Sequence, residues 1–437
     1  MPQLQPVRAA RGVRDILPAA RPSWARVERA AAEGARRFGY QEIDVPIIEP
    51  VALIERGVGG DTDVVRKEIY RLVQHAESGS TELALRPEAT AGMVRAYFEG
   101  GLNQGPQPVR LFTMGPMFRH DRPQAGRYRQ FYQFDVEVIG DEGPAYDAEV
   151  IELTWSWLRN LALRGLSLEL NSIGDPVCRP AYLARLREYY RPLQDRLHPD
   201  CQRRVEDNPL RLLDCKEPQC QPFKEAAPKI TDHLCGPCAE HFSAVQSLLR
   251  EAEIPYRLNP YLVRGLDYYT RTVFEYQHQA LGGAQNALGG GGRYDGLAEA
   301  LGFPATAGVG FAGGLDRIVL MLDEQRREEE GAEPQPDGPD LFLLPDGEDL
   351  DPAAAEVART ARRAASVAAD FSKRSLRAKM RAAGRSGCRW VAIMSPEEAG
   401  RRVVQLRDMT SGEQREVTWD ALPEALARDL ATTGDGR

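Results

Sequence analysis

Two segments in the first half of the chain show the alternation of apolar and polar residues that is typical of strands. Residues 109–119 read VRLFTMGPMFR, and residues 131–140 read FYQFDVEVIG. The second segment places apolar side chains at Tyr132, Phe134, Val136 and Val138, and polar side chains at Gln133, Asp135 and Glu137. Since successive side chains of a strand point to opposite faces, this segment predicts a strand with one apolar and one polar face.

The polar face of this strand has two interpretations. Two acids on an otherwise apolar strand are not expected to be buried without partners. The face therefore either lines a solvated cleft or forms the floor of a site for a cationic or amine-bearing ligand. The charged segment HDRPQAGRYR joins the two strands and is longer than a tight hairpin needs, which is common for loops that carry function.

The N-terminal region shows helical spacing followed by a strand pattern. Ser23 could cap a helix that carries Trp24 and Val27 toward one side, with Gly39 as its stop. The next residues, 40–48, form a strand pattern interrupted by a proline. A proline within a strand favours an edge or an interface over the middle of a sheet.

A glycine-rich turn from a strand into a helix is predicted at residues 308–322, GVGFAGGLDRIVLML. Its helical part has a core-facing stripe made of Leu315, Ile318, Val319 and Leu322. Arg317 falls in the first turn of this helix, where the helix dipole disfavours a cation. An arginine in that place, next to glycines, indicates a bound anion.

A run of four glycines, residues 289–292, is followed by Arg293 and Tyr294. By itself it predicts a close approach of the backbone to another group, or a sharp turn. It is not a G-x-G-x-x-G motif between a strand and a helix, and the chain has no G-x-x-x-x-G-K-[ST] phosphate loop. The glycine run alone does not define a phosphate-binding loop. The adjacent Arg293 and Tyr294 favour that interpretation.

The composition divides the chain into four stretches. Residues 1–166 and 256–323 carry the strand and glycine patterns of an α/β (α+β) core, and residues 167–255, rich in Leu, Arg and Cys, predict a helical insertion. Residues 324–339 are charged, contain prolines and predict a linker. Residues 340–437 begin with a short apolar run that predicts a buried strand in a small α/β domain.

Length, composition and charge narrow the class of protein. The 437 residues are 42% hydrophobic, which suits a globular protein, and no apolar run approaches the roughly 20 residues that span a bilayer. We therefore expect no membrane association. Seven cysteines without a secretory signal favour the reducing cytoplasm. The net charge of −8 argues against a small, dedicated nucleic-acid-binding module.

One basic run departs from this acidic total. Between residues 373 and 389 the chain has no acid and carries Lys373, Arg374, Arg377, Lys379, Arg381, Arg385 and Arg389. The run is interpreted either as a solvated helix face or as a surface that faces phosphates.

The motifs together resemble the class II aminoacyl-tRNA synthetases, and specifically the histidyl-tRNA synthetase family. The helix and strand that end at Pro46 are similar to the first class II motif, which builds a dimer interface. The strand pair with Arg119 and its loop is similar to the second motif, and GVGFAGGLDR to the third. LVRGLDYY, residues 262–269, and GGGGRYDGL resemble the two histidine-specific signatures.

The resemblance implies an antiparallel-sheet catalytic core, a helical insertion, a C-terminal anticodon-binding domain and a homodimer. It implies that ATP, carried with Mg²⁺, activates L-histidine, which is then transferred to tRNA-His. Arg119 and Arg264 would hold the ATP α-phosphate, and Arg317 the γ-phosphate. Histidine would be bound by Glu88, Thr90, Gln133, Glu137, Arg264, Tyr268, Tyr269 and Tyr294.

For tRNA, the resemblance implies that Arg122 and Gln124 contact the acceptor end. Three positions depart from the family pattern: Ala89 and Lys373 stand where glycine is usual, and Asp316 where glutamate is usual. Lys373 lies in the stretch that resembles the anticodon-binding module of the family.

The cysteines raise the question of a metal. Cys215, Cys220, Cys235 and Cys238 have a spacing that could hold tetrahedral zinc. The alternative is that four free cysteines pack within the helical insertion. The resemblance gives little support for a required metal, so no metal ligands are assigned.

Two other functions stay open at this point. A non-catalytic regulatory paralogue of ATP phosphoribosyltransferase would share the core, but should lack Arg264 and the C-terminal domain. A tRNA-binding or sensor module would not require an intact polar pocket.

Overall fold

The structure is a computed structural model that describes residues 6–60, 62, 64–73, 81–279, 286–330 and 338–431. The chain divides into two compact units, one of Met1–Asp15 and Ser23–Ala332, the other of Ile16–Pro22 and Glu333–Arg437. Among the described residues, no helix combines the length and the apolar character needed to cross a bilayer.

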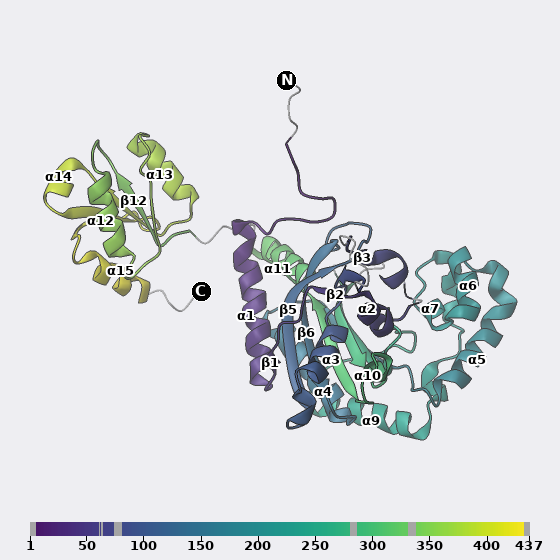
Figure 1. Cartoon of the computed structure of the whole chain (residues 1–437). Coiled ribbons are helices and arrows are strands. Elements are labelled where there is room, and N and C mark those ends of the chain that lie inside the picture. Colours follow the sequence, from purple (N-terminus) through teal and green to yellow (C-terminus); the bar gives the residue numbers. More distant parts are fainter. Residues whose placement is uncertain are drawn as a thin grey trace. The chain divides into compact units, whose positions relative to one another are not determined.

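The first unit is built on an eight-stranded, mostly antiparallel sheet (Figure 1). In spatial order its strands are β1 (Gln41–Glu42), β5 (Val109–Phe118), β6 (Gln130–Ile139), β11 (Gly308–Gly314), β10 (Ala287–Arg293), β9 (Thr270–His278), β7 (Leu166–Ser172) and β8 (Arg257–Leu258). A smaller sheet has the order β2 (Ile48–Pro50), β4 (Leu83–Leu85) and β3 (Tyr70–Arg71). The predicted mixed α/β class with an antiparallel-rich core is confirmed.

Helices in this unit cover the sheet and form a separate group beside it. They are α1 (Arg21–Arg37), α2 (Val51–Val58), α3 (Thr90–Glu99), α4 (Pro144–Asn160), α5 (Arg179–Tyr190), α6 (Pro199–Asp207), α7 (Leu210–Leu213), α8 (Gln221–Lys224), α9 (Gly236–Glu251), α10 (Leu297–Ala300) and α11 (Leu315–Glu330). Figure 1 shows α5, α6 and α7, in teal, to one side of the sheet.

Strand β6 has the two faces that its sequence predicts. On the apolar face, Tyr132 meets Trp24 of α1 with ring centroids 5.4 Å apart, and Phe134 meets Trp157 of α4 at 4.9 Å. The opposite face carries Gln133, Asp135 and Glu137, and all three are buried. Burying a polar group without a partner is costly. The partners of these three residues therefore have to come from the side chains that lie over this face of the sheet.

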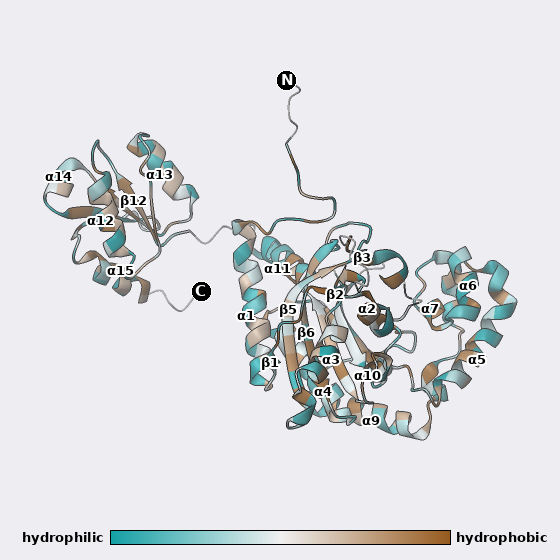
Figure 2. Ribbon diagram, viewed as in Figure 1, coloured by the Kyte–Doolittle hydropathy of each residue, from teal (hydrophilic) through white to brown (hydrophobic). Residues whose placement is uncertain are grey.

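Helix α1 begins earlier than predicted. It starts at Arg21, so Ser23 is an internal residue, not the cap, and its hydroxyl donates to Asp323 Oδ1 at 2.6 Å. Pro22 suits the first turn of a helix, which explains the earlier start. Gly39 ends this region with a φ of +81°, as predicted. Figure 2 shows hydrophilic and hydrophobic residues alternating along α1, as expected for a helix with one buried side.

Three predicted boundaries were wrong. The strand pattern at residues 40–48 forms only the two-residue edge strand β1 before β2 begins at Ile48, because proline cannot donate to a strand ladder. Strand β7, assigned to the helical insertion, belongs to the main sheet, where it pairs with β9. Residues 324–330 of the predicted linker continue helix α11, since glutamate and arginine are strong helix formers. Residues 331–337 lie outside the described residues.

The second unit is a small α/β domain with its own core. Its sheet has the order β13 (Val367–Ala369), β12 (Leu341–Pro345), β14 (Trp390–Met394), β15 (Val403–Asp408) and β16 (Gln414–Thr418). Its helices are α12 (Asp351–Ala361), α13 (Leu376–Arg385), α14 (Pro396–Gly400) and α15 (Leu422–Ala431). Leu341, Leu343 and Leu344 of β12 are fully buried, which confirms the predicted strand.

Candidate active site

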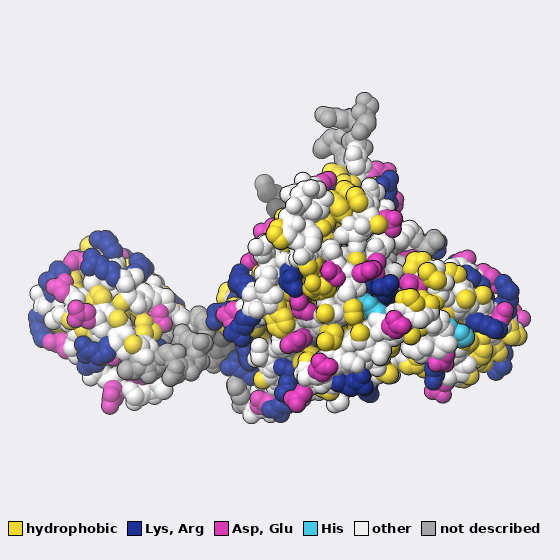
Figure 3. All heavy atoms as spheres, turned by 90° about the horizontal axis from the view of Figure 1, so that it is seen from below, with side chains coloured by type: hydrophobic (Ala, Val, Ile, Leu, Met, Phe, Trp, Pro, Cys, Tyr) yellow, Lys and Arg dark blue, Asp and Glu magenta, His cyan; other side chains and the backbone are white. Residues whose placement is uncertain are grey.

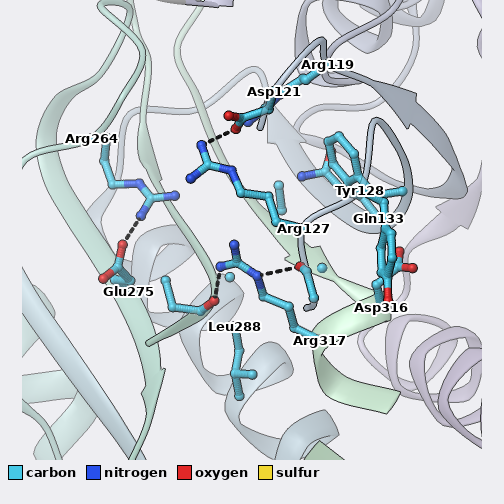
Figure 4. Close-up of a pocket in the computed structure, with 16 residues that line it drawn as sticks. Arg119, Asp121, Arg127, Tyr128, Gln133, Arg264, Glu275, Leu288, Asp316 and Arg317 are labelled. Carbon is cyan, nitrogen blue, oxygen red and sulfur yellow. Dashed lines mark hydrogen bonds and ion pairs between the residues drawn. The ribbon is translucent and has the colours of Figure 1, made fainter. Parts of the chain in front are cut away.

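A polar pocket opens over the middle of the main sheet, where β6, β11 and β10 are neighbours. It is lined by Arg119, Asp121, Gly126, Arg127, Tyr128, Phe131, Gln133, Arg264, Glu275, Ala287, Leu288, Gly289, Ala312, Gly314, Asp316 and Arg317. Four of these residues are arginines, and three are acids. Figure 4 shows the guanidinium groups of Arg264, Arg127 and Arg317 converging from different elements. Such a set of fixed cations is suited to a ligand with several negative charges.

Arg264 reaches the pocket from the loop before β9. Its Nη1 donates to Glu275 Oε2 at 2.6 Å, and its Nε is buried without a hydrogen-bond partner. A buried donor without a partner is costly in a resting protein. The arrangement therefore leaves hydrogen-bonding capacity on Arg264 for a bound ligand.

The glycine run of β10 makes room for this arginine. A Cβ atom at Gly290 would lie 2.5 Å from Arg264 Nη1, and one at Gly291 would overlap the Gly310 carbonyl of β11. Only glycine therefore allows Arg264 to lie across β10 while β10 and β11 stay paired. The run is a strand that accepts a side chain at close range, and not a phosphate loop.

Arg293, directly after the glycines, does not face a ligand. Its side chain is fully buried, forms an ion pair with Asp147 of α4 and donates to the Asp141 carbonyl at 3.1 Å. His241 Nε2 lies 3.2 Å from the same Asp147. This arginine joins β10 to α4, so the interpretation of Arg293 as support for a phosphate cradle was wrong.

Arg317 is held where α11 begins. Its Nε donates to the Gly126 carbonyl at 3.0 Å, and its Nη1 to the Ala287 carbonyl at 2.6 Å. These bonds fix the guanidinium on the pocket side of the helix start. The preceding Asp316 is used differently: it accepts from the Tyr132 backbone at 2.7 Å and from Arg14 at 2.8 Å.

Arg119 enters the pocket from the end of β5. Its Nε donates to the Pro87 carbonyl at 2.9 Å, and its guanidinium lies over the Phe131 ring at 5.3 Å. Next to it, Glu88 accepts the backbone N–H groups of Thr90 and Ala91, at 2.9 and 3.1 Å. Glu88 therefore caps helix α3 as well as lying beside Arg119.

A second group of polar side chains lies on the same face of β6 as Gln133. Glu137 accepts hydrogen bonds from Thr90 Oγ1 at 2.7 Å and from the Tyr294 hydroxyl at 2.6 Å. Burial raises the pKa of Glu137 well above its usual range, and the hydrogen bonds from Tyr294 and Thr90 oppose that rise. The Oε1 atom of Gln133 is buried without a partner. This floor offers acceptors to a ligand with N–H groups.

Aromatic residues close one side of this polar floor. Tyr268 packs against Tyr269 at 4.6 Å and against Tyr294 at 5.8 Å between ring centroids. Tyr269 and Tyr294 are buried. The structure thus brings the sequence-predicted arginines to one pocket, and Thr90, Glu137 and the tyrosines to one polar floor beside it.

Sequence reasoning missed several pocket residues, among them Arg127 and Glu275. Arg127 lines the pocket and forms an ion pair with Asp121 in the loop between β5 and β6. Glu275 holds Arg264 from strand β9. Glu275 had a usable signal, since it is an acid in the otherwise apolar segment TVFEY, as are Asp135 and Glu137 in β6.

The residues predicted to contact tRNA lie at the surface. Arg122 and Gln124 are exposed in the loop between β5 and β6. In the second unit, five residues of the basic run are exposed, namely Lys373, Arg374, Arg377, Arg381 and Arg385. Lys379 is an exception: it is buried and its Nζ donates to the Pro345 carbonyl at 2.6 Å, so it cannot face phosphates. Figure 3 shows Lys and Arg gathered in patches on this unit.

The four cysteines proposed as one zinc set do not come together. Cys215 and Cys220 lie with Cys201, whereas Cys235 and Cys238 lie with Cys178 and Asp175. Of the two alternatives, the hypothesis of a single Cys₄ zinc site was therefore wrong, because the two cysteine pairs belong to different parts of the insertion, which the sequence spacing does not reveal.

Asp135 yields a prediction about stability and pH. Both of its carboxylate oxygens are buried without hydrogen-bond partners. Burial raises the pKa of Asp135 well above its usual range, Glu88 raises it further, and Arg86 and Arg119 oppose the rise. Below the unfolded-state pKa of about 3.9, the Asp135 carboxyl is protonated in both the folded and the unfolded state, and its contribution to stability is fully present. This stability is lost as the pH rises from that value through the higher folded-state pKa, because the unfolded state ionises first.

We therefore expect Asp135→Asn to raise the free energy of unfolding at neutral pH by roughly 1 kcal/mol or more, since an amide cannot ionise in the buried site. The difference from the wild type should shrink as the pH is lowered toward 4, which urea unfolding at several pH values would measure. A variant that is less stable than the wild type at neutral pH would contradict this account.

Known proteins are similar to this chain over nearly its whole length. The family model described as histidyl-tRNA synthetase matches residues 12–318, and one described as anticodon binding domain matches residues 340–429. A protein of Desulforudis audaxviator named histidine–tRNA ligase is 48% identical over 96% of this chain and 98% of its own. One of the same name from Desulfitobacterium hafniense is 44% identical over 98% of this chain and 100% of its own. The apo S. aureus histidyl-tRNA synthetase structure is 33% identical with a TM-score of 0.77, covering 96% of this chain and 100% of the other.

Proposed function

Because this chain belongs to the histidyl-tRNA synthetase family, we propose that its pocket activates L-histidine with ATP and transfers the histidine to the 3′ end of tRNA-His. The activity is that of an ATP-dependent histidine–tRNA ligase. One observation carries the proposal: Arg119, Arg264 and Arg317 meet in one pocket, beside a polar floor formed by Gln133 and Glu137.

In the first step, a carboxylate oxygen of histidine attacks the α-phosphorus of ATP. The bond from that phosphorus to the bridging oxygen breaks, so that histidyl-adenylate forms and pyrophosphate leaves. Negative charge develops on phosphoryl oxygens, and no nucleophilic side chain is needed. Positioning and fixed positive charge therefore carry the catalysis.

The three arginines divide this work. Arg119, oriented by the Pro87 carbonyl and the Phe131 ring, would hold the α-phosphate and the histidine carboxylate. Arg264, held by Glu275, would stabilise the α-phosphate from the other side. Arg317, fixed at the start of α11, would hold the γ-phosphate. Arginine suits each role because it stays charged and presents a planar fork of donors.

ATP would enter with Mg²⁺ carried on its phosphates. The three acids that line the pocket are already paired: Asp121 with Arg127, Glu275 with Arg264 and Asp316 with Arg14. The protein therefore supplies arginines to the phosphates, and it offers no dedicated carboxylate cage for the ion among the described residues.

Selection of histidine would depend on the polar floor. Gln133 and Glu88 would contact the α-amine, while Glu137, held by Thr90 and Tyr294, would accept from the imidazole. Tyr268, Tyr269 and Tyr294 would enclose the ring. A site built to pair both ring nitrogens leaves buried groups unpaired with any other amino acid, which can give roughly 10,000-fold rejection.

In the second step, a ribose hydroxyl at the 3′ end of tRNA attacks the histidyl carbonyl and AMP leaves. The exposed Arg122 and Gln124 would contact the acceptor end, and residues 340–429 would bind the anticodon. This role in protein synthesis fits a cytoplasmic protein.

A homodimer is part of the proposal. Strand β1 lies at the edge of the main sheet, and the nearby Ile47 and Ile48 are 41% and 49% exposed. Large apolar side chains beside an open sheet edge are suited to burial against a second copy.

We expect the purified protein to exchange labelled pyrophosphate into ATP only when histidine is present. The other amino acids, added singly, are the matched control. Absence of exchange with histidine would favour a non-catalytic regulatory or sensor role, and equal exchange with several amino acids would contradict the proposed pocket.

A further inference from the structure

Six of the seven cysteines lie in two clusters outside the active-site pocket. We propose that one of them, formed by Asp175, Cys178, Cys235 and Cys238, binds a structural zinc ion. The ligand atoms of these four residues all lie within 4.8 Å of one another. The proposal does not depend on the enzymatic activity.

The distances within the cluster fit a single tetrahedral ion. The two sulfur atoms of Cys178 and Cys238 are 3.9 Å apart. Asp175 Oδ1 lies 3.4 Å from Cys178 Sγ and 3.9 Å from Cys235 Sγ. Zinc bonds of about 2.3 Å to sulfur and about 2.1 Å to oxygen give tetrahedral edges of roughly 3.5 to 3.8 Å. The atoms therefore surround the volume of one ion and leave no space for a multi-iron cluster.

Two short motifs supply the ligands, each at the start of a helix. Asp175 and Cys178 are spaced D-x2-C directly before α5, and Cys235 and Cys238 are spaced C-x2-C at the start of α9. This two-residue spacing is typical of structural zinc sites.

The backbone already shapes the first motif. The N–H groups of Val177 and Cys178 donate to Asp175 Oδ1 at 2.9 and 3.2 Å, and the Asp175 N–H approaches Cys178 Sγ at 3.4 Å. Gly174 has a φ of +65°, and a Cβ atom there would lie 2.7 Å from Cys178 Sγ. Hydrogen bonds from backbone N–H groups to the ligands are the usual support around a metal.

A positive charge lies beside the cluster and would offset part of the negative charge of a zinc ion bound by three thiolates and a carboxylate. Arg179 follows Cys178 and is electrostatically coupled to both Cys178 and Asp175. Its guanidinium donates to the Ile173 and Gly174 carbonyls, at 3.1 and 3.0 Å.

The second cluster does not have the same properties. Cys201, Cys215 and Cys220 are all buried, and the Cys201 and Cys215 sulfur atoms are 3.2 Å apart, closer than the edge of a zinc tetrahedron. No fourth ligand joins them among the described residues. These three cysteines act as packed apolar side chains.

The proposed ion would join the insertion to the core. Helix α5 belongs to the insertion, whereas α9 packs against α4 of the core. The same loop reaches the histidine pocket: the Arg271 N–H donates to the Gly174 carbonyl at 2.7 Å, and Arg179 Nη2 donates to the Tyr269 carbonyl at 2.7 Å. Loss of the ion should therefore loosen the segment that carries Tyr269.

Metal analysis of the purified full-length protein, after dialysis against a weak chelator, tests the proposal. We expect about one zinc ion per chain, with an X-ray absorption spectrum that requires three sulfur ligands and one oxygen ligand. Cys238→Ser should lose the zinc, and Cys215→Ser, from the second cluster, is the matched control that should keep it. Absence of zinc, or retention in Cys238→Ser with loss in Cys215→Ser, would overturn the proposal.

A second measurement covers the case in which Cys238→Ser fails to fold. Asp175→Asn keeps all three sulfur ligands and the shape of the side chain. Cobalt added to the metal-free wild type should give the sulfur-to-cobalt absorption of a tetrahedral site, and Asp175→Asn should change the visible bands of that spectrum. An identical cobalt spectrum in the variant would exclude Asp175 as a ligand and overturn the four-ligand site.

Discussion

Arg264→Gln should lower the rate of histidine-dependent pyrophosphate exchange about 100- to 1000-fold, the usual effect of losing one fixed donor at a developing charge. Arg264 is anchored by Glu275 and has a buried Nε without a hydrogen-bond partner. This donor is therefore available to a bound ligand. Glutamine keeps a polar side chain, but it is shorter and has neither the charge nor the fork of donors. Steady-state exchange at saturating ATP and histidine measures the effect.

The control for Arg264→Gln is Arg185→Gln, since Arg185 is an exposed arginine of α5 that, among the described residues, pairs only with Glu188 on the same helix. It should exchange pyrophosphate at the wild-type rate. Both variants should show wild-type circular dichroism. A folded Arg264→Gln protein that keeps a near-wild-type rate would remove Arg264 from the proposed catalytic role.

Glu137→Gln should raise the KM for histidine by roughly 100-fold and leave the KM for ATP unchanged. The carboxylate accepts from both Thr90 and Tyr294. An amide can accept on only one of its two positions, so one buried hydroxyl and the imidazole donor would lose their partner. Leaving buried hydrogen-bonding groups without a partner costs about 3 kcal/mol at the upper end, which corresponds to that change in affinity.

Gly310→Ala tests the same floor without removing any polar atom. A Cβ atom at Gly310 would overlap the Glu137 carboxylate, whereas one at Gly296 would meet nothing within 4 Å. We expect Gly310→Ala to raise the KM for histidine as Glu137→Gln does, and Gly296→Ala to behave as the wild type. Unchanged histidine KM in both Glu137→Gln and Gly310→Ala would mean that histidine binds elsewhere.

Local patterns in the sequence predicted the core elements well. The alternation in FYQFDVEVIG predicted strand β6 and its two faces, because strand periodicity is a property of neighbouring residues. The stripe of Leu315, Ile318, Val319 and Leu322 predicted the buried side of α11 for the same reason. The position of Arg317 at the start of that helix also followed from local spacing.

Local patterns gave wrong boundaries in two situations. In one, the composition of a linker and the propensity for a helix occur in the same segment, and in the other, pairing with a distant strand determines the structure. Helix propensity carried α11 through the charged residues 324–330, although their composition resembles that of a linker. Strand β7 lies beside cysteine-rich helical sequence, so the change of domain at residues 166–172 left no compositional mark.

The sequence by itself determined the family, the order of the motifs and the candidate arginines, because the signatures around Arg119, Arg264 and Arg317 are contiguous. Only the tertiary structure decided which side chains contact the residues of those motifs. It placed Glu275 against Arg264, paired Arg293 with Asp147, buried Lys379 and divided the cysteines between two clusters. Each of these contacts depends on side chains brought together by the packing of separate elements, and packing over long sequence distances has no periodic trace in the chain.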